Sequence, residues 1–445
     1  MLDSASFEHH LTGLVEQSAN PVSFTVPATA RFIIAYSGGL DSHVLLHLMH
    51  STSLNCLAVY IDHGLQQASK SWSEHCAGVC QQLNIPFQSI TVNARADKGE
   101  SPEASARTAR YQALAEQMQA GDILLTAQHL QDQSETLLLQ MLRTSGPAGL
   151  AAMPLAKAFA KGLHLRPLLQ LERAELQAYA STHQLQWVED PSNNDQRYDR
   201  NFFRQSIFPL LKKRWPTINQ TLANVSGLQA EAAELMDDLA ALDADISIQG
   251  RQLIISHLVK LSPARQRNLI RYWLRQRQLD APTAKRLKEI LGSMITAGAD
   301  KMPVVNWANT EVRRFQGKLY AMKTLPAFDV HQRIEWLPEQ PLLLSVQQCE
   351  VSMTAAASGL SEDVLGRSLS VTFRSGGERI KPLGRAHTMD LKKLMQEAAI
   401  PPWQRSRIPL IYLDDQLIAV AGYWVADEFK NAAGQPAWQV VCREI

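Results

Sequence analysis

The sequence predicts an α/β protein with three domains: an N-terminal domain built on a parallel β-sheet, a mainly helical middle domain and a small α+β domain at the carboxyl end. Length is the first observation, because 445 residues exceed the roughly 250–300 that one hydrophobic core supports. The second is an alternation of short apolar runs with helical patterns through the first 215 residues, which favours a parallel sheet. The third is an apolar repeat of three and four residues at 218–242, which predicts a long amphipathic helix.

Five short apolar runs of the first domain are expected to form buried strands. They lie at 32–36, 57–61, 86–92, 123–127 and 184–188. In doubly wound sheets, ligands gather at the carboxyl ends of the strands, so the residues that follow each run are candidates for a binding site. Cys76 and Cys80 lie on the helix after the second strand, where no further metal ligand is near, and we expect them to belong to its apolar face.

The turn after the first strand has the composition of an anion-binding loop. It reads Ser37-Gly38-Gly39-Leu40-Asp41-Ser42 and leads into a helix. Adjacent glycines allow a tight turn whose N–H groups converge, and a helix N-terminus favours an anion there. The lysine of a Walker-type loop is missing, and Asp41 would repel phosphate unless a metal ion bridged the two. The alternative is a glycine-rich turn without a ligand.

Polar side chains follow the other predicted strands as well. Asp62 and His63 end the second strand, although His63 is equally compatible with a surface histidine. Arg107 and Arg110 share one helix face and would suit phosphate, with solvated surface charge as the alternative. The remaining candidates cluster at the fourth strand–helix junction or on the helix that follows the last strand: His129, Asp132, Glu135, Thr136, Arg200 and Arg204.

The carboxyl half begins after Arg214-Trp215-Pro216, so we expect domains at 1–215, 216–325 and 346–445 with a proline-containing linker at 326–345. Ser262 and Pro263 predict a helix start. Residues 265–288 contain eight basic residues and one acidic residue, a local net charge of +7. The stripe Arg267, Arg271 and Arg275 on this helix favours nucleic-acid binding over a solvated face. Two runs around Gln316-Gly317 predict a hairpin.

The last domain alternates predicted strands with one helix. Its Ser375-Gly376-Gly377 lacks the following Asp-Ser and helix, so we expect a turn and no phosphate site. Arg379, Arg385 and Arg405 are candidates for contacts with an RNA backbone, and solvated surface charge is the alternative for each.

Composition limits the class of protein. The 44 basic and 43 acidic residues give a net charge of +1, so nucleic-acid binding must depend on local patches. Five scattered cysteines without a CxxC motif favour a reducing compartment. No signal segment and no membrane-spanning apolar run are evident, so we expect a cytoplasmic protein without a membrane partner. The sequence does not determine the oligomeric state, for which a homodimer is one candidate.

The strand, Ser-Gly-Gly-x-Asp-Ser turn and helix resemble the pyrophosphate loop (PP-loop) of the N-type ATP pyrophosphatases, whose domain is Rossmann-like. Further segments resemble the tRNA(Ile)-lysidine synthetase family in the same order along the chain. They are 62–65, 103–111, 126–136, the Arg-x-Ser-Gly-x-x-Gly-Leu of 143–150, and the Asp-Pro-Ser-Asn…Arg-Asn-x-x-Arg of 190–204. The chain departs from the family at Gln131, where relatives often carry an aspartate, which leaves Asp132 as the candidate carboxylate.

The resemblance implies ATP-dependent adenylation of a wobble cytidine, followed by attack of free L-lysine. It implies ATP and Mg²⁺ as cofactors, with Asp41 at the metal, and an isoleucine tRNA with a CAU anticodon as partner. The expected ATP site contains Ser37, Gly38, Gly39, Leu40, Asp41, Ser42, Asp62, His63, Arg107, Arg110, Thr126 and His129. The expected substrate site contains Asp132, Glu135, Asn193 and Asn201, and the expected catalytic residues are Asp41, Asp132, Arg200 and Arg204.

Two other functions are compatible with this fold. One is a PP-loop tRNA thiolase, which would rely on active-site cysteines or an iron–sulfur cluster. Cys76 and Cys80 have no partner in the sequence pattern, which argues against it. The other is a non-catalytic RNA-binding protein with a relic nucleotide fold, and the intact Ser-Gly-Gly-Leu-Asp-Ser turn argues against that.

Overall fold

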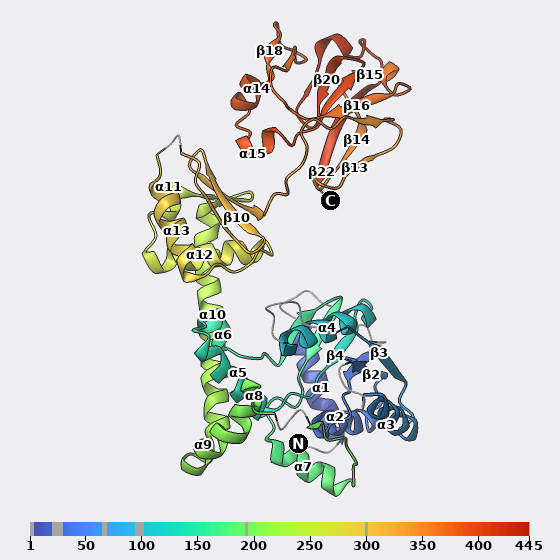
Figure 1. Cartoon of the computed structure of the whole chain (residues 1–445), viewed down its shortest axis with the longest axis vertical. Coiled ribbons are helices and arrows are strands. Elements are labelled where there is room, and N and C mark those ends of the chain that lie inside the picture. Colours follow the sequence, from blue (N-terminus) through green and yellow to red (C-terminus); the bar gives the residue numbers. More distant parts are fainter. Residues whose placement is uncertain are drawn as a thin grey trace. The chain divides into compact units, whose positions relative to one another are not determined.

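The structure is a computed structural model that describes residues 4–19, 30–64, 69–93, 102–191, 195–298 and 301–444. The chain divides into two compact units, Met1–Asp238 and Leu239–Ile445. The first unit holds the predicted α/β domain, and the second holds the middle and carboxyl-terminal domains (Figure 1). The division falls inside α10 (Ile218–Ser247), a helix of 30 residues whose two ends belong to different units.

The first unit is built on a six-stranded sheet with the order β3-β2-β1-β4-β6-β5. All neighbouring strands are parallel except β5 and β6, which form an antiparallel hairpin at the edge. The strands are β1 (Phe32–Ala35), β2 (Cys56–Asp62), β3 (Phe87–Thr91), β4 (Ile123–Leu125), β5 (Ala156–Phe159) and β6 (Gly162–Leu165). The first four predicted strands are confirmed, while the hairpin was not predicted.

Helices cover both faces of this sheet. They are needed there because successive side chains of β1 point to opposite faces and all of them are apolar. Ile34 packs into the core shared with α1 and α2, whereas Ile33 packs on the other face with Leu114 of α4 and with Met118, which directly follows that helix. A strand buried on both faces reads as a continuous apolar run, which is why it was recognisable in the sequence. The helices are α1 (Ser4–Ala19), α2 (Leu40–His50), α3 (Ser69–Gln82), α4 (Pro102–Gln117), α5 (Leu130–Leu142), α6 (Pro147–Leu150), α7 (Arg173–Thr182), α8 (Asp199–Phe202) and α9 (Phe208–Arg214).

The predicted strand at 184–188 is wrong. Residues 185–190 have no regular secondary structure. The N–H of Val188 instead donates to the carbonyl of Gly38 at 2.9 Å, so this segment pairs with the turn after β1 and not with the sheet. Leu185 and Trp187 pack against the core, which explains the strand-like apolar pattern.

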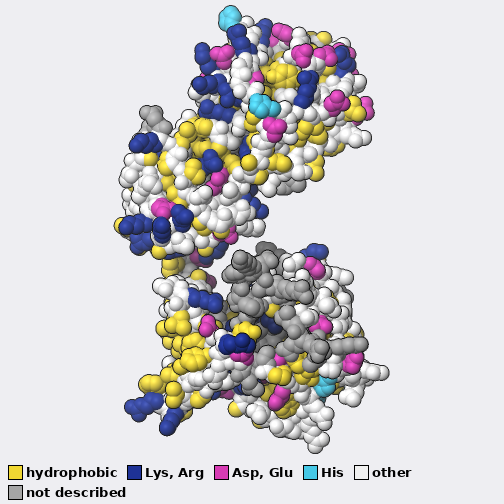
Figure 2. Space-filling view, in the orientation of Figure 1, with side chains coloured by type: hydrophobic (Ala, Val, Ile, Leu, Met, Phe, Trp, Pro, Cys, Tyr) yellow, Lys and Arg dark blue, Asp and Glu magenta, His cyan; other side chains and the backbone are white. Residues whose placement is uncertain are grey.

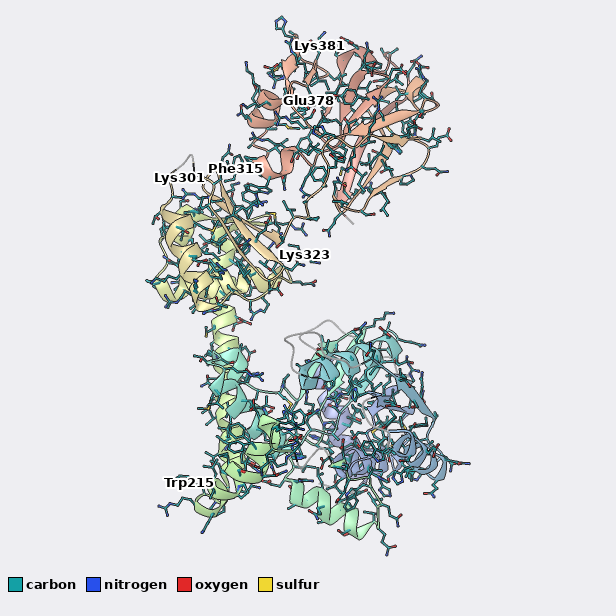
Figure 3. The ribbon with its side chains drawn as sticks, viewed as in Figure 1. Trp215, Lys301, Phe315, Lys323, Glu378 and Lys381 are labelled. Atoms are coloured by element: carbon teal, nitrogen blue, oxygen red, sulfur yellow. The ribbon has the colours of Figure 1, made fainter. Side chains whose placement is uncertain are left out.

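The second unit begins with a layer of helices on a five-stranded antiparallel sheet of order β7-β8-β11-β10-β9. Its strands are β7 (Ile248–Gln249), β8 (Gln252–Ile254), β9 (Val304–Trp307), β10 (Thr310–Phe315) and β11 (Lys318–Lys323), and its helices are α11 (Ile255–Leu258), α12 (Pro263–Gln276) and α13 (Ala284–Glu289). The helical pattern of this region is confirmed, and Ser262 caps α12 by accepting the N–H of Arg265. The predicted hairpin is β10–β11, with Phe315 at its turn (Figure 3). The sheet beyond this hairpin was not predicted.

The carboxyl-terminal domain is α+β, as predicted, with a five-stranded sheet (β12-β16-β19-β20-β21), a four-stranded sheet (β13-β14-β22-β15) and a strand pair (β17-β18). The strands are β12 (Ile334–Trp336), β13 (Leu342–Leu344), β14 (Cys349–Ala356), β15 (Leu360–Ser361), β16 (Leu369–Thr372), β17 (Arg379–Ile380), β18 (Met389–Asp390), β19 (Leu410–Leu413), β20 (Gln416–Val420), β21 (Trp424–Val425) and β22 (Ala437–Glu444), and the helices are α14 (Leu391–Glu397) and α15 (Pro402–Arg405). Part of the predicted linker at 326–345 therefore forms strands, because β12 and β13 pair with β16 and β14.

Ser375-Gly376-Gly377 is a turn, as predicted. The N–H groups of Ser375 and Gly376 both donate to Glu378 Oε1, at 2.6 and 2.7 Å. Glu378 therefore occupies the place that an anion would need (Figure 3).

The cysteines follow the sequence expectation. All five cysteines are free thiols, and Cys76 and Cys80 are fully buried. Among the helices that the structure describes, none has the length and apolar character needed to cross a bilayer.

Gly38→Ala is expected to destabilise the first unit by about 1–3 kcal/mol. Gly38 has φ +79°, and a Cβ there would lie 2.8 Å from Cys76 Sγ. We expect a lower melting temperature by calorimetry. The control is Gly78→Ala within α3, where nothing lies within 4 Å of the added carbon, and stability should be equal or higher by up to about 1 kcal/mol. Equal melting temperatures of the wild type and Gly38→Ala would show that a side chain at position 38 causes no strain.

Candidate active site

The turn after β1 closes on itself through Ser42. Its hydroxyl donates to the carbonyl of Gly39 at 3.0 Å and accepts the N–H of Ser37 at 3.2 Å. Gly39 is the N-cap of α2 and has no side chain that could accept from the first turn of the helix. The first backbone donors of α2, at Leu40 and Asp41, therefore face a position that suits an anion.

Asp41 lies in the first turn of α2 beside this position. Its Oδ2 is 3.8 Å from Nε2 of His129, and its buried Oδ1 has no hydrogen-bond partner among the residues described. Burial raises the pKa of Asp41, an effect that His129 opposes. A buried carboxylate oxygen without a partner fits a Mg²⁺ ion, which typically binds one or two carboxylates together with substrate phosphates. The described residues hold no cluster of three or more His, Cys, Asp or Glu side chains able to form an all-protein metal site.

His129 links Asp41 to Asp132. It is the N-cap of α5 and is 1% exposed. Its Nδ1 accepts the N–H of Gln131 at 3.2 Å, so in the neutral ring the proton is on Nε2, which faces Asp41 and lies 3.5 Å from Asp132 Oδ2. Asp132 also accepts the N–H of His129 at 3.0 Å, which completes a capping box.

Arg204 joins the two carboxylates of α5. Its Nε and Nη2 donate to the two oxygens of Glu135 at 2.8 and 2.9 Å, and Nη2 also donates to Asp132 Oδ1 at 3.0 Å. Glu135 is fully buried, and burial raises its pKa against the opposing effect of Arg204. Burial would lower the pKa of Arg204, but the contacts with Glu135 and Asp132 outweigh it and the pKa is raised.

A short π-helix, Phe203–Ile207, carries Arg204 between α8 and α9. Such irregular turns change the direction of a side chain relative to an α-helix and are frequent at functional sites. The family resemblance implies that Arg204 is a catalytic residue. The fork with Glu135 occupies Nε and Nη2, and Nη1 makes no hydrogen bond to the described part of the chain.

The other predicted catalytic and substrate residues are Arg200, Asn201 and Asn193. Arg200 donates to the hydroxyl of Thr136 at 3.2 Å, which brings it to α5. Asn201 donates to the carbonyl of Asp195 at 2.9 Å and so has a structural contact. Asn193 lies outside the described residues.

The remaining ATP candidates follow β2 or lie on α4. Asp62 accepts the N–H of Gly64 at 2.8 Å, and the buried Nδ1 of His63 has no hydrogen-bond partner in the described ranges. Burial, followed by the field of Arg110, lowers the pKa of His63. The guanidinium groups of Arg107 and Arg110 lie 5.0 and 5.5 Å from the centre of the Tyr111 ring, so the two cations share one face. His63 and Arg110 are thus brought near each other, as a shared nucleotide site would require.

Several residues near the site were not predicted. Gln131, the departure from the family pattern, donates to Glu135 Oε1 at 3.2 Å. Val188 and Cys76 support the turn at Gly38. The hydroxyl of Thr126 contacts buried His164 at 2.7 Å. No sequence signal could find His164, because its strand β6 was itself missed.

The predicted basic stripe lies on the exposed side of α12. Arg267, Arg271 and Arg275 are exposed, while Leu269, Ile270, Trp273 and Leu274 are buried on the opposite side. Figure 2 shows Lys and Arg side chains gathered where α12 and α13 lie. Burial and the neighbouring Arg267 lower the pKa of Arg271.

The predicted arginines of the carboxyl-terminal domain have local partners. Arg379 pairs with Asp390 at 3.4 Å and Arg385 with Glu397 at 3.2 Å. Arg405 donates from Nε to the carbonyl of Ile400 at 2.8 Å.

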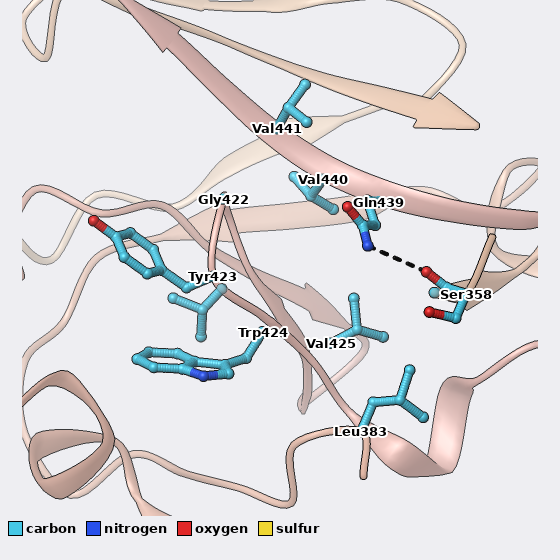
Figure 4. A pocket seen from close by; sticks show the side chains of 11 residues that line it. Ser358, Leu383, Gly422, Tyr423, Trp424, Val425, Gln439, Val440 and Val441 are labelled. Atoms are coloured by element: carbon cyan, nitrogen blue, oxygen red, sulfur yellow. Dashed lines mark hydrogen bonds between the residues drawn. The ribbon is translucent and has the colours of Figure 1, made fainter. Parts of the chain in front are cut away.

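A pocket of about 250 Å³ lies in the carboxyl-terminal domain (Figure 4). Tyr423, Trp424 and Val440 are among its lining residues, and Gln439 donates across it to the carbonyl of Ser358 at 3.2 Å. No predicted site residue lines it.

Arg204→Met is expected to lower the free energy of unfolding by about 3–5 kcal/mol at neutral pH, because it leaves two carboxylates without their cation. Glu135 has a raised pKa in the folded state, so its contribution favours folding at low pH and is lost as the pH rises through that pKa. Removing Arg204 raises this pKa further. The loss in free energy of unfolding relative to the wild type should therefore be larger at pH 8 than at pH 5.

Urea unfolding at both pH values measures this difference. The control is Arg214→Met at the exposed end of α9, where the change should stay within about 0.5 kcal/mol. A deficit that is equal at the two pH values would contradict the role of Arg204 as the counter-ion of Glu135.

Comparison with known proteins gives matches along most of the chain. The family described as PP-loop domain matches residues 6–211, the TilS substrate binding domain matches 253–320 and the TilS substrate C-terminal domain matches 369–442. Among solved structures, the TilS C-terminal domain covers 26% of this chain and 98% of its own, with 18% identity and a TM-score of 0.22. The U34-tRNA thiolase NcsA from Methanococcus maripaludis covers 50% and 80%, with 14% identity and a TM-score of 0.39. TM-scores this low have no bearing on function.

Curated relatives cover nearly the whole chain. The tRNA(Ile)-lysidine synthase of Methylococcus capsulatus is 41% identical over 409 residues, which is 90% of this chain and 93% of the relative. That of Coxiella burnetii is 39% identical over 423 residues, which is 94% of each chain. Together with the PP-loop geometry and the two carboxylates of α5, these matches show that the chain belongs to the tRNA(Ile)-lysidine synthase family.

Proposed function

We propose that this enzyme ligates free lysine to C2 of the wobble cytidine in the CAU anticodon of an isoleucine tRNA. ATP adenylates the C2 oxygen and pyrophosphate leaves. The ε-amine of lysine then attacks C2, AMP leaves with that oxygen, and the product is lysidine. The modified anticodon reads AUA in place of AUG, and the tRNA changes its identity from methionine to isoleucine.

The observation that carries the proposal is the grouping of an anion-binding turn with two carboxylates and two arginines at one end of the parallel sheet. Asp41, His129 and Asp132 form a continuous row with separations of 3.8 and 3.5 Å. A carbonyl-like oxygen is a poor leaving group until it is adenylated, so an enzyme for this ligation must hold ATP and an amine substrate side by side. The row supplies an anion site at one end and a negative charge for an ammonium group at the other.

The turn Ser37–Ser42 is the proposed site for the pyrophosphate part of ATP, with Asp41 as the ligand of Mg²⁺. The unpartnered Oδ1 of Asp41 supports this assignment. When bound, the ion would offset the charge that develops on the departing pyrophosphate. Asp62, His63, Arg107, Arg110 and Thr126 are the further residues proposed for the nucleotide.

Asp132 is the proposed partner of the lysine α-ammonium group. Its side chain is 13% exposed, whereas Glu135 is fully buried, so a ligand can reach only the former. Glu135 then serves to hold Arg204, whose second hydrogen-bonding nitrogen orients Asp132. Arg200 suits the cytidine or its phosphate, and so does Nη1 of Arg204, which makes no hydrogen bond within the described ranges.

A PP-loop tRNA thiolase is the less supported alternative. Such chemistry needs a reactive thiolate or a metal cluster. Cys76 and Cys80 are fully buried in the apolar core, and burial raises the pKa of each thiol to about 12. Both thiols are therefore poor candidates for a nucleophile at neutral pH.

The tRNA is proposed to contact the carboxyl half, through Arg267, Arg271 and Arg275 and through Arg379, Arg385 and Arg405. The CAU loop is shared with the methionine tRNA, so discrimination requires contacts with more of the tRNA body than the anticodon. Five free thiols and the tRNA substrate support a cytoplasmic location. A homodimer stays a prediction.

Asp41→Asn is expected to abolish pyrophosphate release and lysidine formation while tRNA binding stays within a few-fold of the wild type, because the carboxylate holds the metal and not the RNA. The assay combines the enzyme, ATP, labelled lysine and an isoleucine tRNA, followed by nucleoside analysis. Asp199→Asn on exposed α8 is the matched control. Near-normal pyrophosphate release by Asp41→Asn would remove Asp41 from the mechanism, and a wild type that forms no lysidine would overturn the proposed function.

Replacing Arg267, Arg271 and Arg275 by glutamine is expected to weaken tRNA binding and to reduce the slope of log affinity against log salt by roughly one to three units. Phosphate contacts of this kind release counter-ions, and their loss is read directly from that slope. The control is the same change at Arg333, Arg367 and Lys430, which lie close to carboxylates in surface ion pairs. An unaltered affinity and slope in the first triple variant would leave the stripe as ordinary surface.

A further inference from the structure

A chain of polar side chains, most of them buried, leads from Arg166 after β6 to Gln128, which lies between β4 and α5. Arg166 follows β6 and is 2% exposed, and its Nη2 lies 3.3 Å from Nδ1 of His164. His164 is fully buried, and its Nε2 lies 2.7 Å from the hydroxyl of Thr126. That hydroxyl in turn donates to Oε1 of Gln128. The four side chains form one continuous sequence of hydrogen bonds.

The chemistry of Arg166 fixes the direction of every bond in this chain. A guanidinium group can only donate, so Nδ1 of His164 must accept. The imidazole is neutral, because burial and the nearby cations, Arg166 first, lower its pKa to about 2. Its one proton is therefore on Nε2 and is donated to Thr126. The proton of Thr126 is then left for Oε1 of Gln128.

The direction of the chain determines which end of the Gln128 amide faces the site. Its oxygen is held by Thr126, so its NH₂ group points the other way. Gln128 is partly exposed, and its Nε2 makes no hydrogen bond to any residue that the structure describes. Two strong donors are thus fixed in orientation and available to a ligand.

The register of the sheet places Gln128 beside the PP-loop. Strands β1 and β4 are parallel, with Ile34 opposite Leu125. Ser37 follows Ile34 by three residues, and Gln128 follows Leu125 by the same number. Gln128 also directly precedes His129, whose Nε2 faces Asp41.

We propose that Gln128 is a nucleotide-binding residue whose NH₂ group donates to a phosphate oxygen of ATP, and that Arg166 and His164 are positioning residues that hold the amide in this orientation. The proposal rests on the proposed function, since that function places a triphosphate at the PP-loop. An amide donor suits this place because it binds phosphate oxygens without adding a charge to the neighbourhood of His129 and Asp41.

Gln128→Met keeps the length of the side chain and removes the donor. We expect the KM for ATP to rise about tenfold, as for one lost hydrogen bond to a charged group, with little change in the KM for lysine. Gln177→Met, at an exposed position of α7, is the matched control and should leave both constants unchanged. An unchanged KM for ATP in Gln128→Met would overturn the assignment of Gln128.

A double-mutant cycle tests the positioning role. His164→Gln should raise the KM for ATP in the same way, and the double variant His164→Gln/Gln128→Met should be no worse than Gln128→Met alone, because the first change acts through the second residue. If the two substitutions raise the KM for ATP independently, so that their effects multiply in the double variant, His164 does not act through Gln128, and its positioning role is overturned. The ¹⁵N NMR signals of His164 in the wild type provide a readout that needs no variant, and a ring protonated on Nδ1 would also overturn it.

Binding of a non-hydrolysable ATP analogue, measured by calorimetry on the enzyme alone, separates this inference from the proposed function. The tenfold loss in Gln128→Met is expected there too. If Gln128→Met and the wild type bind the analogue equally well while the wild type forms lysidine, the role of Gln128 is overturned and the proposed function stands. If the wild type binds the analogue but forms no lysidine, the proposed function is overturned, and the affinity of Gln128→Met still tests the role of Gln128.

Discussion

The charge balance between Arg204 and the two carboxylates of α5 is the constraint on which the first unit depends. Glu135 is fully buried, and an ionised carboxylate there is stable only beside a cation with good geometry. Arg204 supplies that cation from 69 residues further along the chain. The segment of α8 and the π-helix must therefore dock on α5 before the site is complete. The same bonds orient Asp132, so the stability of the fold and the geometry of the proposed lysine site share one interaction.

A second set of contacts ties the start of α10 to the same helix. Ser134 of α5 donates to the carbonyl of Asn219 at 3.3 Å, and the amide of Asn219 donates to Glu172 at 3.0 Å. Both Ser134 and Asn219 are fully buried. The first turn of α10 is therefore part of the first unit, although its sequence pattern is that of the next predicted domain. The apolar repeat in the sequence of an amphipathic helix shows which of its residues face a core. It does not show which unit provides that core.

The parts of the fold that could be predicted from the sequence are those with a local signal. Strands β1, β2 and β4 contribute buried residues to both faces of the sheet and read as apolar runs. The edge strand β3 is only half-buried, with Phe87 and Ile90 packed against the two cores. The Gly38-Gly39 turn is set by its own residues. The hairpin β5–β6 was missed because Lys157 and His164 interrupt the apolar pattern. The fork of Arg204 on Glu135 and the contact of Val188 with Gly38 join residues distant in the sequence, and no spacing rule encodes them.

The candidate tRNA contacts differ in a way that composition could not reveal. Arg379 and Arg385 lie in ion pairs with carboxylates, whereas Arg267 and Arg271 make no ion pair with any residue of the described ranges. A phosphate that binds a paired arginine must compete with its carboxylate, which remains nearby and repels it. Burial, and then the neighbouring Arg267, lowers the pKa of Arg271, and a phosphate bound at the stripe would relieve the repulsion between these two arginines. The three candidate arginines of α12 are therefore expected to contribute more to the proposed RNA affinity than the three candidates of the carboxyl-terminal domain.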